Sequence, residues 1–386
     1  MKRGLTGTYT SSIAGGKNCQ AFIPFPLPPN PELNINKKLQ SHINEAMLAL
    51  GRLDAISVLL PDVPDVKLFL YAYVRKEAVM SSQIEGTQSS LNDLMMYEIG
   101  GEFAVPMDDV QEVSCYVNAL LLGVQRINEQ RPITFRLLVE LHEALMASGR
   151  GISRSPGKFR TNQVWIGGHS AEVATFVPPP ALVIKDCWAD LERFINDVPE
   201  ATDPLIKAAL IHVQFETIHP FMDGNGRLGR LLIPLILVEA KVLQQPLLYL
   251  SVFFKKHRET YYELLQQVRI SGDWESWLLF FVDAVADTAQ QAVATVKQLN
   301  DLKNEHKNQL LNCGRLAGSA VQVLETLCSQ PIASIATLAE RSNLASATVG
   351  KVIDLLVELN IVHEKTGRKR NRIYEYTQYV AILNQD

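Results

Sequence analysis

The sequence His219-Pro-Phe-Met-Asp-Gly-Asn-Gly-Arg-Leu-Gly-Arg230 joins two apolar helical patterns and decides how the chain is organised. Asp203 directly before a proline is typical of a helix start, so we expect a helix that ends near His219. Gly224 and Gly226 allow a sharp turn that exposes backbone N–H groups at the start of the next helix. The sequence therefore predicts an anion-binding turn between two helices.

The charges of this turn suit a polyphosphate and a metal ion. Arg227 and Arg230 fall at the start of the second helix, where cations oppose the positive end of the helix dipole, so we expect an anion beside them. Asp223 offers one hard oxygen ligand, and Mg²⁺ commonly takes one or two carboxylates together with water and phosphate oxygens. His219 lies where helix becomes loop, and an imidazole that titrates near neutral pH suits a general base. A structural glycine-rich loop between helices is the plainer alternative.

The same stretch resembles the Fic family signature HPFxDGNGRxxR at every fixed position. The resemblance implies that the chain is a protein adenylyltransferase, which transfers AMP from ATP to a Ser, Thr or Tyr hydroxyl of a protein with Mg²⁺ as cofactor. In that reaction His219 would be the catalytic base and Asp223 the metal ligand. The phosphate-binding residues that the resemblance implies are Asp223, Gly224, Asn225, Gly226, Arg227 and Arg230.

Two further segments resemble parts of this family. Residues 156–160 and 163–168 look like the flap, a hairpin whose edge pairs with the target segment. The flap residues implied at the site are Val164, Trp165, Ile166 and Gly167. Tyr261 stands where relatives have an aromatic residue near the adenine, although a core position at helical spacing explains it equally well. A purely structural hairpin is the alternative for the flap.

A short motif upstream predicts self-inhibition. Ser81 and Glu85-Gly86 follow a helical run and resemble the family's inhibitory motif: Ser or Thr, three residues, Glu, then Gly or Asn. Glu85 would be an anion at the negative end of its helix dipole, which is unfavourable in isolation. Arg230 has the opposite problem, because it is a cation at the positive end of its own helix dipole. An ion pair between Glu85 and Arg230 would offset both unfavourable interactions with the helix dipoles. The resemblance implies that Glu85 takes Arg230 from the terminal phosphate, and in some relatives the same glutamate aligns water for removal of AMP.

Hydrophobic periodicity predicts a mainly α fold: a Fic helical fold with a short β-hairpin flap and a C-terminal winged helix-turn-helix domain. The N-terminal segment is rich in proline and glycine, and we expect an extended arm that lies over another surface. The expected parts are the Pro/Gly-rich arm (1–38), a helical region with the inhibitory helix (39–110), the Fic catalytic domain (111–290), a helical linker (291–314) and the winged-helix domain (315–386).

The C-terminal part follows the order of a winged helix: three short helices, then a strand–turn–strand around Gly367. Its expected wing is basic, and such wings contact phosphates. The basic residues are Lys365, Arg368, Lys369, Arg370 and Arg372. The third helix, over 347–359, has few residues suited to base edges. The sequence leaves DNA contact open beside a protein-interaction role or support of a homodimer.

Composition narrows the class of protein further. The 386 residues are 47% hydrophobic with a formal net charge of −4, which argues against a surface given over wholly to nucleic acid. Five widely spread cysteines without a CxxC pair, and the absence of a signal-peptide or membrane-spanning pattern, predict a cytoplasmic location without membrane contact. We expect the partner to be a protein substrate, or the chain itself.

The sequence is also compatible with two other functions. A DNA-binding transcriptional regulator could use the Fic core to sense nucleotide. Within the enzyme class, some relatives transfer UMP, phosphate or phosphocholine, because the loop recognises a diphosphate rather than a base.

Overall fold

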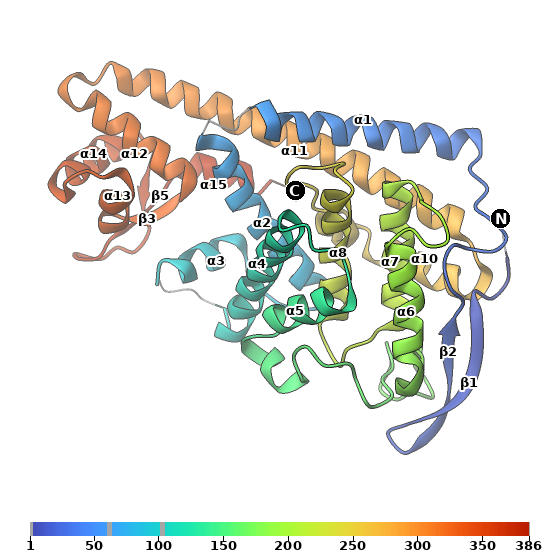
Figure 1. Cartoon of the computed structure of the whole chain (residues 1–386). Coiled ribbons are helices and arrows are strands. Elements are labelled where there is room, and N and C mark those ends of the chain that lie inside the picture. Colours follow the sequence, from blue (N-terminus) through green and yellow to red (C-terminus); the bar gives the residue numbers. More distant parts are fainter. Residues whose placement is uncertain (1–2, 60–63, 101–104, 386) are drawn as a thin grey trace.

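The computed structural model describes residues 3–59, 64–100 and 105–385, and helices dominate it, as the sequence predicts (Figure 1). In chain order the α-helices are α1 (Lys37–Leu59), α2 (Pro64–Ile84), α3 (Leu91–Glu98), α4 (Met107–Asn128), α5 (Phe135–Leu145), α6 (Ile184–Ile195), α7 (Pro204–Ile218), α8 (Asn225–Glu239), α9 (Ser251–Lys256), α10 (Arg258–Ser271), α11 (Trp274–Leu311), α12 (Ala317–Ser329), α13 (Ile335–Ser342), α14 (Ser346–Glu358) and α15 (Thr377–Leu383). Short 3₁₀ turns are η1 (Gly149–Arg154), η2 (Ala181–Val183) and η3 (Gly314–Leu316). The strands are β1 (Gly7–Ala14), β2 (Lys17–Pro24), β3 (Ile332–Ser334), β4 (His363–Glu364) and β5 (Ile373–Glu375).

Helices α7 and α8 lie side by side in the core and carry the loop between them. The carboxylate of Asp203 accepts hydrogen bonds from the N–H groups of Leu205 at 3.0 Å and Ile206 at 3.2 Å, so α7 begins where the sequence predicts. Residues on all sides of α7 are buried, which fits its mainly apolar composition, and the buried set includes the polar residues His212, Gln214, Glu216 and Thr217. Helices α2 and α4 pack against α8. The loop between α7 and α8 is therefore fixed at both ends by the core.

The N-terminal segment forms a β-hairpin, not the extended arm that its prolines suggested. Strands β1 and β2 pair antiparallel along their whole length around Gly15 and Gly16, whose φ angles are 57° and 80°. A two-residue hairpin turn needs positive φ at both positions, and glycine adopts it without steric cost. The sequence carried this signal, because a Gly-Gly pair between alternating runs is typical of such a turn.

This hairpin supports the segment expected to be the flap. That segment has one antiparallel bridge, between Ile166 and Phe176, in place of the regular hairpin that we expected. The N–H of Phe22 donates to the carbonyl of Val177 at 2.9 Å, which joins β2 to the flap. Buried residues of both segments form one small cluster apart from the main core: Ala14, Cys19, Ala21, Ala171 and Val177. Long-range packing, which local patterns do not encode, supplies the order of the flap.

The C-terminal part rests on α2, the helix that precedes Glu85. Helix α11 runs without a break through the expected linker and ends beside α12, and α12 and α15 pack against α2 (Figure 1). Three short helices and the sheet β3-β5-β4 appear in the expected order. The functional interpretation as a winged helix stays a prediction. None of the helices that the structure describes is long and apolar enough to cross a membrane.

Candidate functional site

The general-base candidate lies at the exact turn from α7 into the loop. His219 is the C-cap of α7, with φ of 48° and its N–H bonded to the carbonyl of Phe215 at 2.9 Å. Burial lowers the pKa of His219 to about 3, and the nearby Arg160 guanidinium acts in the same direction. The imidazole is therefore neutral at pH 7 and able to accept a proton.

The loop is braced from inside by Asn225. Its side chain accepts the N–H of Phe221 and donates to the carbonyl of the same residue, both at 2.9 Å. The resemblance gave Asn225 a role in phosphate binding, but both amide atoms are engaged within the loop. Asn225 thus shapes the loop that is expected to cradle phosphate, and its backbone N–H lies at the start of α8.

The cradle itself is an open helix start. Gly224 is the N-cap of α8 with φ of 77°, and no side chain within the described residues caps this helix. A Cβ atom at Gly224 would lie 2.8 Å from the sulfur of Met146, so the close approach also requires glycine. Uncapped N–H groups at a helix N-terminus favour an anion.

His142 and Arg160 tie the loop to the flap. The N–H of Gly157 donates to Nδ1 of His142 at 2.8 Å, so Nε2 carries the proton and donates to the carbonyl of Asp223 at 3.0 Å. Burial lowers the pKa of His142 to about 4, which keeps this arrangement at neutral pH. Nε of Arg160 donates to the carbonyl of His219 at 2.9 Å. His142 of α5, which the flap residue Gly157 orients, and Arg160 of the flap therefore hold the loop backbone.

Arg230 and Glu85 are paired, as the opposed helix charges predicted. Nη2 of Arg230 lies 2.7 Å from Oε1 of Glu85. The same guanidinium donates to the hydroxyl and to the carbonyl of Ser81, each at 2.9 Å. Partial burial alone would raise the pKa of Glu85, but Arg230 holds it below its ordinary value. Arg230 is almost wholly buried, so it has little freedom to bind Glu85 and another anion at once.

Glu85 also lies over the start of α8. A Cβ atom built on Gly226 would be 2.2 Å from Oε1 of Glu85. The carboxylate thus occupies space directly beside the phosphate cradle. Gly226 is needed for this approach, although its backbone does not have positive φ.

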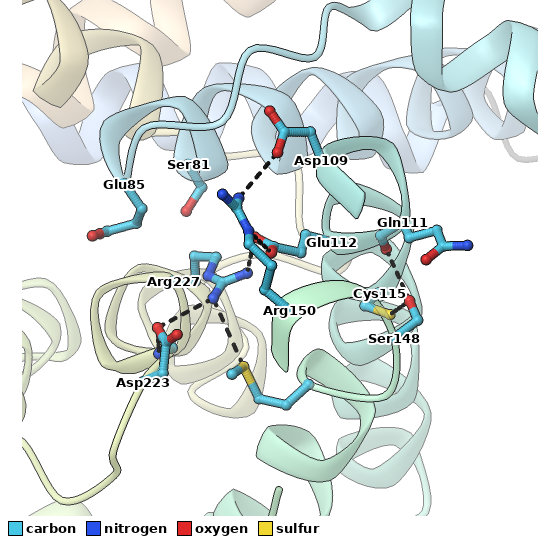
Figure 2. Close-up of polar contacts among 12 residues, drawn as sticks. Ser81, Glu85, Asp109, Gln111, Glu112, Cys115, Ser148, Arg150, Asp223 and Arg227 are labelled. Carbon is cyan, nitrogen blue, oxygen red and sulfur yellow. Dashed lines mark hydrogen bonds and ion pairs between the residues drawn. The ribbon is translucent and has the colours of Figure 1, made fainter. Parts of the chain in front are cut away.

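Arg227 contacts three groups, and Figure 2 shows it between two of them, Glu112 and Asp223. Its Nη1 lies 3.2 Å from Oε2 of Glu112, and its Nη2 lies 3.5 Å from Oδ1 of Asp223 and 3.7 Å from the sulfur of Met146. The Arg227 side chain is buried and its Nε has no hydrogen-bond partner within the described residues. An unpaired buried donor is uncommon, and a phosphate oxygen is one acceptor whose chemistry would fit it.

The donor set fits a magnesium ion that is shared with a nucleotide. Oδ1 of Asp223 accepts the N–H of Gly224 at 2.6 Å, and the side chain is 43% exposed. Mg²⁺ that is bound through one carboxylate takes its other ligands from phosphates and water. The described residues contain no group of three or more His, Cys, Asp or Glu side chains that could hold a metal alone. Asp223 is therefore the residue that would hold Mg²⁺ here.

The structure corrects the expectation for Tyr261. This residue is 1% exposed, and its hydroxyl bonds to Nε2 of His212 at 2.8 Å within a cluster of core aromatic rings. Its neighbour Tyr262 is 39% exposed, and the guanidinium of Arg258 lies 5.5 Å from its ring centroid. Tyr262 is thus the residue of this pair whose side chain is accessible. Adjacent helical positions point about 100° apart, and the sequence could not decide which of the two faces the core.

The flap residues are accessible, as a binding role requires. Each has some exposure, and the glycine after Ile166 adopts φ of 70° at the turn. The residues are Val164, Trp165, Ile166 and Gly167. Their contact with nucleotide or target stays a prediction.

Sequence reasoning missed Asp109, Glu112, His142 and Arg150. None lies in a short motif with the loop, and His142 is 81 positions from its partner Asp223. A partial signal was present in the two acidic residues three apart on a helix, which share one face. That face could not be matched to an arginine without the tertiary structure.

Comparison with known proteins finds two family models along the chain. Residues 40–125 match the Fic/DOC family N-terminal region, and residues 132–237 match the Fic/DOC family. The chain is 34% identical over 175 residues to a Drosophila yakuba protein named protein adenylyltransferase Fic, and 32% identical to the protein of that name from Culex quinquefasciatus. These matches cover 45% of the chain and 31% of each relative. The similarity therefore concerns less than half of this chain and about a third of each relative.

Solved structures share the fold over a larger part of the chain. A Fic family protein from Desulfovibrio desulfuricans aligns with a TM-score of 0.57 and 21% identity, covering 91% of this chain and 98% of the other. A Fic domain containing signaling protein from Bacteroides thetaiotaomicron aligns with a TM-score of 0.52 and 19% identity, covering 65% and 95%. At these identities the likeness concerns the fold.

Proposed function

We propose that this chain, which belongs to the Fic/DOC family over residues 40–125 and 132–237, transfers AMP from ATP to a hydroxyl side chain of a protein. The observation that carries this proposal is the uncapped start of α8 beside a neutral His219. The relatives named protein adenylyltransferase support the choice of AMP. The whole activity, with Ser, Thr or Tyr as the acceptor, is a proposal.

The geometry suggests how each residue serves the reaction. His219 takes the proton from the target hydroxyl, whose oxygen then bonds to the α-phosphorus of ATP. The bond from that phosphorus to the bridging oxygen breaks, and pyrophosphate leaves with the electron pair. The N–H groups of the α8 start and Arg227 hold the phosphates and offset the charge that develops on them. Mg²⁺ held by Asp223 would neutralise phosphate charge when bound.

Glu85 keeps this site inactive in the arrangement observed. It is paired with Arg230, the residue that the family resemblance assigns to the terminal phosphate. The carboxylate also repels phosphate from the adjacent start of α8. ATP would then bind in a pose that the hydroxyl cannot attack. Tyr262, exposed next to this site, replaces Tyr261 as the proposed adenine contact.

The test is incorporation of label from α-labelled ATP with Mg²⁺. Glu85→Gly should raise labelling of lysate proteins, or of the chain itself, by about tenfold or more, which corresponds to ~1.4 kcal/mol in activation free energy. His219→Ala in the same background should abolish it, because the proton has no acceptor. The matched control is Gln88→Gly, which adds a glycine to the same segment and keeps the Glu85 carboxylate.

Each other outcome has a definite meaning. Equal incorporation in wild type and Glu85→Gly would contradict the gating role of Glu85 alone. Label that appears with Glu85→Gly and persists with His219→Ala would contradict the base assignment. No incorporation in any variant would favour the second candidate, a DNA-binding regulator that senses nucleotide, for which the exposed basic segment Lys365–Arg372 is the supporting observation. Incubation with other nucleotides, followed by intact mass, identifies the transferred group, and release of AMP from labelled protein tests the reverse reaction.

A further inference from the structure

A chain of alternating charges connects the phosphate site to the segment after Glu85. Asp109 and Glu112 lie three apart on α4, both 5% exposed, and face Arg150 from the 3₁₀ turn η1. Nε of Arg150 is 2.8 Å from Oε1 of Glu112, and its Nη2 is 3.0 Å from Oδ1 of Asp109. The guanidinium fork therefore spans two buried carboxylates (Figure 2).

Each carboxylate uses its second oxygen on a different part of the site. Oε2 of Glu112 holds Arg227 at 3.2 Å. Oδ2 of Asp109 accepts the N–H of Gln88 at 2.7 Å, three residues after Glu85. Arg150 thus fixes the orientation of both carboxylates, and through them the guanidinium of Arg227 and the backbone after the inhibitory glutamate.

The backbone of η1 is pressed against α4 at this point. A Cβ atom built on Gly149, which has φ of 65°, would be 3.0 Å from the carbonyl of Asp108 and 3.1 Å from Cγ of Glu112. This close approach fixes the position of the backbone from which the Arg150 side chain extends. The Arg150 side chain is nevertheless 57% exposed, so its removal opens no cavity in the core.

We propose that Arg150 is a positioning residue, which acts through Glu112 to hold Arg227 in the orientation that presents the phosphates for attack. This inference rests on the proposed adenylyl transfer. Arg227 is buried with a free Nε, and Arg150 reaches it only through the shared carboxylate. Loss of the clamp leaves Arg227 as the remaining ion-pair partner of Glu112, so the carboxylate is held from one side only among the described residues. A displacement of Arg227 by a fraction of an ångström then misaligns the α-phosphorus.

The test is made in the full chain with Glu85→Gly already present, so that inhibition does not obscure the result. Arg150→Ala should lower kcat about tenfold and change the dissociation constant of ATP by less than threefold, because positioning fails while phosphate binding persists. Arg150→Lys should not restore kcat, since one ammonium group cannot span both carboxylates as the guanidinium fork does. Glu112→Gln, which keeps the shape of the side chain, should lower kcat in the same direction.

The matched control is Arg154→Ala, which removes an exposed arginine from the same turn and should leave kcat unchanged. Equal kcat for Arg150→Ala and the control would overturn the proposal. Full restoration of kcat by Arg150→Lys would also overturn the proposal, because it would show that a positive charge at this position is sufficient. An increase in the ATP dissociation constant at unchanged kcat would show direct phosphate binding by Arg150 instead. If the Glu85→Gly parent itself transfers no AMP, the proposed function fails first, and the two failures are therefore distinguishable.

Discussion

At the scale of single residues, burial determines the protonation state of the histidines in this site. His219 and His142 are both neutral at pH 7, because burial lowers the pKa of the first to about 3 and of the second to about 4. Nδ1 of the first has no hydrogen-bond partner within the described residues, whereas the second is bonded on both ring nitrogens. A histidine that is neutral and near the phosphate cradle suits proton acceptance, and one held at both nitrogens suits support.

The pH dependence of the reaction follows from His219. A base whose pKa lies near 3 stays unprotonated down to pH 4, so kcat/KM of the Glu85→Gly variant should show no His219 limb between pH 5 and pH 8. Activity should fall only under more acidic conditions. The measurement is the initial rate of AMP incorporation across that range, with ionisation of ATP measured separately. A limb centred near pH 6.5 that is not due to ATP would contradict the assigned environment.

At the scale of one element, helix α2 contains a buried glutamate, Glu77, in addition to leading to Glu85. Glu77 lies two turns before Glu85 and is 2% exposed. Its carboxylate accepts hydrogen bonds from the N–H of Ser251 at 3.1 Å and from Tyr116 at 3.3 Å, and it also bonds the Ser251 hydroxyl. These contacts to α4 and α9 fix the position of α2. Burial raises the pKa of Glu77 to about 7 although the Ser251 donors act in the opposite direction.

This buried acid makes stability depend on pH. The folded-state pKa is above the unfolded one, so folding disfavours the ionised form: the wild type loses stability as pH rises from about 4.5 and the loss is complete above pH 7. Glu77→Gln removes that loss and should gain roughly 3 kcal/mol relative to wild type between pH 4.5 and pH 8. The measurement is the free energy of unfolding in urea at both values. Glu45→Gln, at an exposed glutamate of α1, should show no such gain, and an equal gain there would refute the assignment to Glu77.

At the scale of the whole molecule, both ends of the chain reach elements of the site. The N-terminal hairpin packs against the flap, and the C-terminal helices α12 and α15 pack against α2. The start of the hairpin is tied to α11 by Arg3, whose guanidinium meets both oxygens of Glu275 at 2.9 Å and 2.6 Å. The flap and helix α2 are therefore each supported by a segment far away in sequence.

Breaking the tie between Arg3 and Glu275 should weaken the N-terminal hairpin first. Burial alone would raise the pKa of Glu275, but Arg3 and the N–H of Asn34 lower it to about 2. Its stabilisation is therefore present above about pH 4.5 and is lost as pH falls toward 2. Glu275→Gln should lower the unfolding temperature at pH 7, and the gap to wild type should narrow below pH 4. Hydrogen exchange should rise in β1 and β2 before it rises in α7. Faster exchange in α7 at the same time would contradict a local effect.

The sequence predicted the parts of the site whose chemistry is local. The start of α7 at Asp203, the positive-φ Gly224 and the order of elements in the C-terminal part all follow from capping, turn and periodicity rules that act over a few residues. The pairing of Glu85 with Arg230 was also predicted, because each charge opposed its own helix dipole and the resemblance named the partner.

Only the tertiary structure shows which segments far apart in the chain contact one another. The choice of Tyr262 over Tyr261, the hairpin beneath the flap, and the chain of charges through Arg150 depend on which helix faces meet. Periodicity shows that a face is apolar or charged but not which other face it packs against. The sequence by itself therefore determined the chemistry of the loop from His219 to Arg230, and the packing of α2, α4 and the flap around it determined how that chemistry is held.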